Sequence, residues 1–174
     1  MVKRFAVLAG ATLLAFAAPG QAHQTAINDA QIAHIAYTAG QLDVEAARQA
    51  LQRSRNSEVR AFAKTMARDH QAVNQQALAL LQRLGVTPQE HATSAALTSQ
   101  AAAERQRLAT LEGVAFDRAY AEREAAFHAA VNGALRSTLI PSAQNAELKS
   151  LLEAGLALFS AHQEHAEALA RQLR

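Results

Sequence analysis

Apolar residues recur every three or four positions along most of the chain after residue 26, which is the spacing of amphipathic helices. The clearest stripe lies in the second of these segments and contains Val59, Phe62, Ala63, Met66, His70, Val73, Ala77, Leu80, Leu81 and Leu84. Short alternating runs of β-branched or aromatic residues, which are typical of strands, do not occur in the sequence. The pattern therefore predicts an all-α protein.

Breaks in this pattern divide the chain into five predicted helices, at about 28–53, 58–84, 88–111, 114–139 and 145–173. Asn56 or Ser57 is positioned to cap the second helix, Gly85 and Pro88 separate the second from the third, and Gly113 precedes the fourth. The third segment is rich in alanine and poor in large apolar residues. We therefore expect it to be helical but thinly buried.

The second and fifth predicted helices resemble each other. A shift of 92 residues (162 minus 70) aligns His70 with His162 and Met66 with Leu158. Two helical hairpins joined by a long connection are typical of ferritin-like bundles. We predict a ferritin-like four-helix bundle of two hairpins, joined by a crossover with an extra weak helix, as one domain over residues 23–174.

The start of the chain has the pattern of a secretory signal peptide. A short basic stretch precedes an apolar run from Phe5 to Ala18, and the small residues Gly20 and Ala22 follow. This run is shorter than the roughly 20 residues that span a bilayer. We predict cleavage after Ala22 and a periplasmic or secreted protein without a transmembrane segment, and association with the cell envelope stays open.

Charge and composition limit the partners and the reactive groups that the protein could have. The chain has 17 Lys and Arg against 15 Asp and Glu, and loss of Lys3 and Arg4 with the leader would leave 15 of each. Without a concentrated positive excess, no nucleic-acid partner is predicted. The chain has no cysteine, which excludes disulfides and thiolate chemistry. No phosphate-binding glycine loop or nucleophile turn indicates an enzyme class, so we expect a non-enzymatic protein without catalytic residues.

Histidines and carboxylates gather near the middle of the predicted helices, where bundles place metal ligands. The candidate ligands are Glu45, His70, Glu124, His128 and His162. His70 and His162 fall on apolar stripes and should point inward, whereas His165 falls at the edge of its stripe. Imidazoles favour zinc or copper, and iron favours more carboxylates. The chain contains no Glu-x-x-His, so a complete di-iron centre is not expected.

A structural role is an alternative for the same residues. We expect Asp69 and Asp117 to form part of a structural polar cluster. Asp69 adjoins an inward histidine and is positioned to orient an imidazole, while Asp117 near the start of the fourth helix favours the helix dipole. Buried polar groups need partners, and a histidine–carboxylate cluster can supply its own partners without a metal.

Three segments together resemble a known family. They are SEVRAFAKTMARDHQAVN from Ser57 to Asn74, LEGVAFDRAYAEREAAFH from Leu111 to His128, and His162 shortly before EHAEAL. They are similar to the DUF4142 family, whose members are exported bacterial proteins of unknown function with a ferritin-like fold. The resemblance covers about residues 27–172. It implies a fold and export but no reaction.

The resemblance also indicates which polar residues belong to the family's motifs. Its polar motif positions correspond here to Glu45, Asp69, His70, Asp117, His128 and His162. One departure is Ala157, where the family often has a proline, so a kink at that point is not expected here.

Two functions remain open from the sequence. The favoured one is a non-catalytic binding or stress-related protein whose polar cluster gives the bundle specificity. The other is a metal-binding protein with His70 and His162 at its centre, and a metal-dependent oxidoreductase is a weaker third. The metal-binding hypothesis would be favoured if the ring nitrogens of these two histidines lie within about 5 Å of each other and a carboxylate points toward them.

Overall fold

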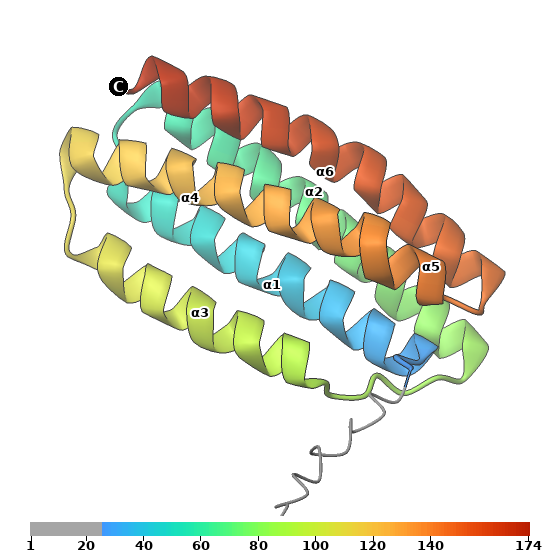
Figure 1. Cartoon of the computed structure of the whole chain (residues 1–174). Coiled ribbons are helices and arrows are strands. Elements are labelled where there is room, and N and C mark those ends of the chain that lie inside the picture. Colours follow the sequence, from blue (N-terminus) through green and yellow to red (C-terminus); the bar gives the residue numbers. More distant parts are fainter. Residues whose placement is uncertain (1–25) are drawn as a thin grey trace, which may run out of the picture.

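The computed structural model describes residues 26–174, which form helices and no strand (Figure 1). The elements are α1 (Asp29–Arg53), α2 (Ser57–Leu84), α3 (Ala92–Ala109), α4 (Gly113–Ala134), the π-helical turn η1 (Leu135–Leu139), α5 (Ile140–Ser142) and α6 (Ala146–Gln172). The all-α prediction is confirmed. The predicted signal peptide lies outside the described residues.

The helices form an elongated bundle. Helix α1 packs along α2, α4 packs along α6, and the two pairs meet through α2 with α6 and α1 with α4 (Figure 1). Helix α3 lies at the edge of the bundle, mainly against α1. Its buried residues are Ser94, Ala101 and Leu108, which confirms the thin burial expected for this segment. Within residues 26–174, no helix combines the length and apolar character needed to cross a membrane.

Asparagines begin three of the long helices. Asn28, Asn56 and Asn145 each accept hydrogen bonds through the side chain from backbone N–H groups of the first helical turn. These caps satisfy donors that have no partner within the helix. Asn56 rather than Ser57 is thus the cap of α2. Helix α2 ends at Gly85, whose φ of 65° is a left-handed conformation that favours glycine.

Helix α3 begins later than the predicted residue 88. The backbone N–H of Gln89 donates to the carbonyl of Ala30 over 3.1 Å, so this stretch is bound to the start of α1 instead of being helical. His91 then caps α3 by accepting from Thr93 N–H.

The fourth helix continues past its predicted end at residue 139. The chain stays helical to Ser142 through η1, in which Ile140 N–H donates to the Leu135 carbonyl five residues before it. Pro141 has no N–H to donate, so an ordinary four-residue hydrogen bond cannot form at that point. Such π turns widen a helix locally without ending it.

Two apolar clusters fill the two ends of the bundle. The aromatic cluster contains Phe62, Met66, Leu108, Phe116 and Tyr120 together with alanines of α1, α2, α4 and α6. The leucine cluster contains Ile32, Ile35, Leu80, Leu81, Leu135, Leu139, Leu148 and Leu152. Between them along each helix lies a set of buried polar residues, called here the polar layer: Asp43, His70, Arg123, Glu124, His128 and His162.

Candidate metal centre

Three histidines from three helices meet in the polar layer. His70 of α2, His128 of α4 and His162 of α6 are all buried, and each pair of ring centroids is 5.5 Å apart. One nitrogen of each ring lies within 4.8 Å of one nitrogen of the other two. Nε2 of His70 and Nε2 of His128 are 3.3 Å apart.

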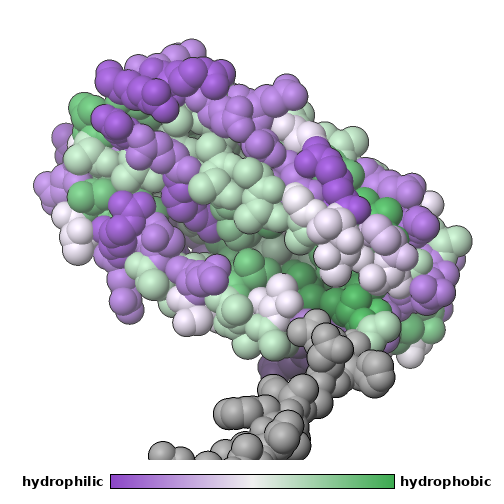
Figure 2. Space-filling model, in the orientation of Figure 1, coloured by the Kyte–Doolittle hydropathy of each residue, from purple (hydrophilic) through white to green (hydrophobic). Residues whose placement is uncertain are grey.

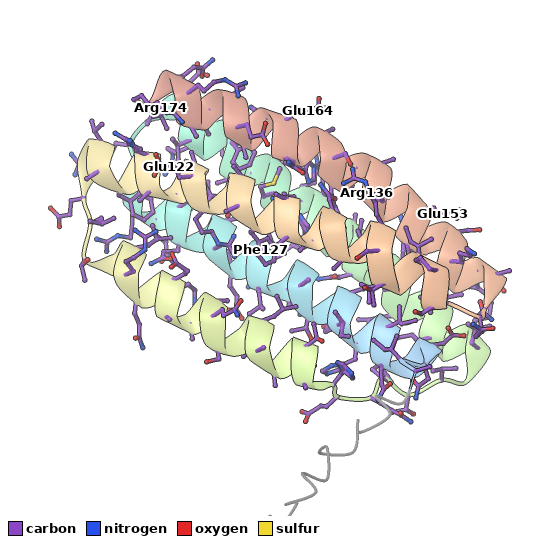
Figure 3. The ribbon with its side chains drawn as sticks, in the orientation of Figure 1. Glu122, Phe127, Arg136, Glu153, Glu164 and Arg174 are labelled. Atoms are coloured by element: carbon purple, nitrogen blue, oxygen red, sulfur yellow. The ribbon has the colours of Figure 1, made fainter. Side chains whose placement is uncertain are left out.

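Helical periodicity places these rings. His70 lies one turn after Met66, and His128 lies two turns after Tyr120, so both share the buried face of an apolar neighbour. His162 lies one turn before the buried Ala166. Glu164 lies on the outer side of α6 (Figure 3).

His165 is exposed, and its ring edge packs on Phe62 with the centroids 5.0 Å apart. Its predicted place at the rim is confirmed.

Hydrogen bonds to oxygen acceptors determine which nitrogen carries the proton on two of the rings. Nδ1 of His128 donates to the backbone carbonyl of Glu124 over 3.0 Å, which leaves its Nε2 without a proton. Nε2 of His162 donates to Asp69 Oδ2 over 3.0 Å, and its buried Nδ1 has no partner. Asp69 is itself held by Arg68 at 2.7 Å. Carbonyl and carboxylate partners of this kind orient metal-bound histidines.

The carboxylate beside His70 is Asp43, which was not among the two predicted carboxylate ligands, Glu45 and Glu124. Asp43 is fully buried, and its Oδ2 lies 3.1 Å from Nε2 of His70. Glu45 is exposed and forms an ion pair with Arg105 of α3. The prediction of Glu45 as a ligand of this cluster is therefore wrong, because two residues along a helix turn the side chain to the opposite side. Ala46, Ala47 and Ala50 share the buried face with Asp43, and that signal was available in the sequence.

An arginine that sequence analysis did not select neutralises the carboxylates. Nη1 of Arg123 lies 3.1 Å from Asp43 Oδ1 and 2.6 Å from Glu124 Oε1, and the Arg123 side chain is 8% exposed. Glu124, a predicted ligand, is fully buried, and its Oε2 lies 3.6 Å from Nδ1 of His128. Glu124 thus joins the polar layer beside the arginine.

No hydrogen bond or ion pair joins Asp69 and Asp117 within the described residues. Asp69 contacts His162, as described above. Asp117 is buried in α4 two turns before Glu124, and its Oδ1 has no hydrogen-bond partner.

Burial favours the neutral form of the His70 and His128 imidazoles. Burial lowers the pKa of His128 to about 4 and also lowers the pKa of His70, although Asp43 opposes both shifts. Burial alone would raise the pKa of Asp43, but His70, His128 and Arg123 hold it below its ordinary value. Burial raises the pKa of Glu124. Neutral imidazoles beside an ionised carboxylate are the protonation state that a metal ion requires.

The spacing fits a small divalent ion. Two imidazole nitrogens bound tetrahedrally to zinc at about 2.0–2.1 Å lie about 3.3–3.4 Å apart. The His70–His128 nitrogen separation is 3.3 Å. The third ring has a nitrogen within 4.8 Å of the other two, so it would need to move by up to about 1.4 Å to reach the same tetrahedral spacing.

A cavity of about 540 Å³ adjoins the cluster. Its walls come from α1, α2, α3, α4 and α6 and contain many alanines, whose small side chains leave space between the helices. His70 and His128 form part of the wall. Figure 2 shows apolar residues at the surface between α3 and α4, on the same side of the molecule. Two of the three rings are therefore reached from an apolar space.

Comparison with curated proteins and with solved structures gives no match. The family described as a domain of unknown function, DUF4142, matches residues 14–169, which is nearly the whole chain. The protein therefore belongs to the DUF4142 family.

Proposed function

We propose that this protein binds one divalent transition-metal ion through His70, His128 and His162, with Asp43 as the fourth ligand. The observation that carries this proposal is the convergence of three buried imidazoles, with one nitrogen of each within 4.8 Å of the others. The neutral state of the His70 and His128 rings supports it, as do the carbonyl partner of His128 and the carboxylate partner of His162.

An unpartnered buried nitrogen favours a metal over a self-contained polar cluster. Nδ1 of His162 is buried and forms no hydrogen bond within the described residues. Leaving such an atom unpartnered costs about 1–3 kcal/mol. A cluster retained for structural specificity alone would be expected to satisfy this atom, and this is why we place the metal-binding role above the purely structural one.

The ligand set selects the ion. Three imidazoles and one carboxylate suit Zn²⁺ or Cu²⁺, whereas iron sites of helical bundles use more carboxylates. Zinc has no redox chemistry, so holding or sensing the ion is the role that we assign to the centre.

We extend the proposal to the fold type and the location. The hairpin of α1 and α2, the hairpin of α4 and α6, and α3 in the crossover support a ferritin-like four-helix bundle. The apolar stretch from Phe5 to Ala18 supports export to the periplasm. Mass spectrometry of the protein isolated from its native cells is expected to give an N-terminus near His23, and an intact Met1 would contradict export.

Elemental analysis of untagged protein, dialysed against zinc and then against metal-free buffer, tests the proposal. We expect one ion per chain in the unmodified protein, none in His162→Ala, and one in the matched control His165→Ala, because His165 is an exposed rim residue. Circular dichroism verifies that each variant is helical. Absence of zinc from the unmodified protein, or equal zinc in His162→Ala, would contradict metal binding and would favour a structural role for the polar layer.

A further inference from the structure

A second group of potential metal ligands lies beside the three histidines. Asp43, Glu124 and His128 each offer one ligand atom, and these atoms lie within 4.8 Å of one another. All three residues are buried. Oε2 of Glu124 is buried and accepts no hydrogen bond within residues 26–174, and Oδ2 of Asp43 lies 3.1 Å from Nε2 of His70. Carboxylates that are buried in this way need a positive charge close by.

The positive charge in this group is Arg123. Its Nη1 contacts one oxygen of each carboxylate, at 3.1 Å from Asp43 and 2.6 Å from Glu124. The guanidinium also lies over the ring of Phe127, with Cζ 4.3 Å from the ring centroid. The two carboxylates together with the stacked ring hold the cation in one place.

The guanidinium of Arg123 cannot become neutral by losing a proton. An arginine side chain stays protonated at all ordinary pH values, and here the two carboxylates raise its pKa further. A divalent ion between Asp43 and Glu124 would meet a fixed positive charge in a medium of low polarity, where repulsion is much stronger than in water. Moving Arg123 aside would leave it buried without its partners.

We infer that Arg123 occupies the place of a second metal ion and limits the centre to one. Removal of its charge would open a site for a second divalent cation between Glu124 and Asp43, whose two carboxylate oxygens would then bridge the two ions. Two carboxylates make this site harder than the three-histidine site, so manganese or iron would suit it better than copper. The inference rests on the proposed function for the first ion, but the second site does not use His70 or His162.

Elemental analysis after equilibration with manganese and zinc tests the inference in a set of variants. Arg123→Gln removes the charge and is expected to bind one ion per chain more than the unmodified protein. Arg123→Lys keeps the charge and is expected to bind the same number as the unmodified protein. Equal numbers in Arg123→Gln and the unmodified protein would overturn the inference, and a gain in Arg123→Lys would overturn the role of the charge.

A double variant separates this inference from the proposed function. His162→Ala with Arg123→Gln lacks a ligand of the first site and is expected to bind one ion, against none in His162→Ala alone. No ion in the double variant would overturn the inference. If the unmodified protein binds none but Arg123→Gln binds one, the proposed function fails and the inference stands.

Folding of the variant is a further readout. Loss of Arg123 removes the counter-ion of the buried Asp43 carboxylate and the hydrogen-bond donor of Glu124, so Arg123→Gln is expected to be less stable in a chelator than in manganese. If the variant is unfolded in the chelator, manganese is expected to restore its helical circular dichroism. Failure of manganese to raise either the stability or the helicity of this variant would overturn the inference.

Discussion

The aromatic cluster and the polar layer lie next to each other on the same helices and are buried to the same degree, but they are built in opposite ways. In the aromatic cluster, Phe62 meets Tyr120 edge-on at 6.1 Å and Tyr120 stacks with Phe116 at 6.2 Å. Such packing stabilises a fold directly. The polar layer places charged groups and imidazoles in the same interior and leaves several of their atoms without partners.

This difference indicates that the aromatic cluster stabilises the fold, whereas the polar layer serves the proposed metal site. Burial of apolar side chains lowers the free energy of the folded chain, whereas burial of imidazoles and carboxylates raises it unless a partner compensates. Natural proteins tolerate such a cost where a site requires it. The polar layer is therefore expected to respond to substitution, pH and metal in ways that the aromatic cluster does not.

The largest effect is expected from truncation in the aromatic cluster. Phe62→Ala removes a fully buried ring and is expected to lower the free energy of unfolding by about 3–5 kcal/mol. Urea denaturation followed by circular dichroism measures this change. A loss below about 1 kcal/mol would show that this cluster is not the stabilising part of the bundle.

Asp43→Asn is expected to lower the free energy of unfolding by about 2–3 kcal/mol, which is less than Phe62→Ala, because Glu124 remains as a partner for Arg123. The same variant is expected to weaken zinc binding, measured by calorimetry. A variant of unchanged stability and affinity would remove Asp43 from both roles. Glu45→Gln serves as the matched control on the same helix.

The pH dependence of stability also distinguishes the two regions. The pKa of His128 is about 4 in the folded protein against an ordinary value of 6.5, and the pKa of His70 is lowered in the same direction. Between these values the unfolded chain binds more protons, so the free energy of unfolding decreases as pH falls from 6.5 to 4. We expect a loss of about 3 kcal/mol from His128 in metal-free protein.

Urea denaturation at several pH values in a chelator measures this loss, and His128→Leu is expected to remove most of it. An unchanged stability between pH 6.5 and pH 4 would contradict the neutral, buried state of the imidazoles. Phe62→Ala is expected to keep the same pH dependence, since the aromatic cluster does not titrate in this range.

His162→Leu is expected to change the stability of the metal-free protein little, or to raise it by about 1 kcal/mol, because an apolar side chain replaces a buried imidazole. It is also expected to abolish zinc-dependent stabilisation, which for the unmodified protein is about 2.7 kcal/mol at a zinc concentration 100 times Kd. Thermal denaturation with and without zinc measures both. A large loss of stability without metal would assign His162 a structural role.

The smallest effect is expected at the surface. Glu45→Gln removes an ion pair whose side chains are 48% and 35% exposed, and such pairs contribute about 0–1 kcal/mol. Zinc affinity is expected to be unchanged. A weaker zinc affinity in this variant would contradict the position of Glu45 outside the cluster.

The sequence predicted much of the fold because the signals are local. Apolar periodicity located the long helices, and asparagines with Gly85 fixed most of their ends. The π turn was missed because it depends on how Pro141 is accommodated within a helix that continues.

The candidate site was predicted in part. His70, His128 and His162 follow from periodicity, and the structure brings them together. Asp43 lies near the middle of its helix but was not chosen as a ligand, because Glu45, two positions later, matched the family pattern. Arg123 was missed because a long basic side chain is usually solvated, and only the packed helices show that it lies between two buried carboxylates.

X-ray absorption spectroscopy of the zinc-loaded, untagged protein tests the central claim most directly, because it reports the ligands of the bound ion. The account predicts one zinc ion with three imidazole nitrogens and one oxygen at about 2.0–2.1 Å, and a loss of bound zinc in His162→Ala. A zinc ion without imidazole scattering, or a protein that binds no zinc, would contradict it.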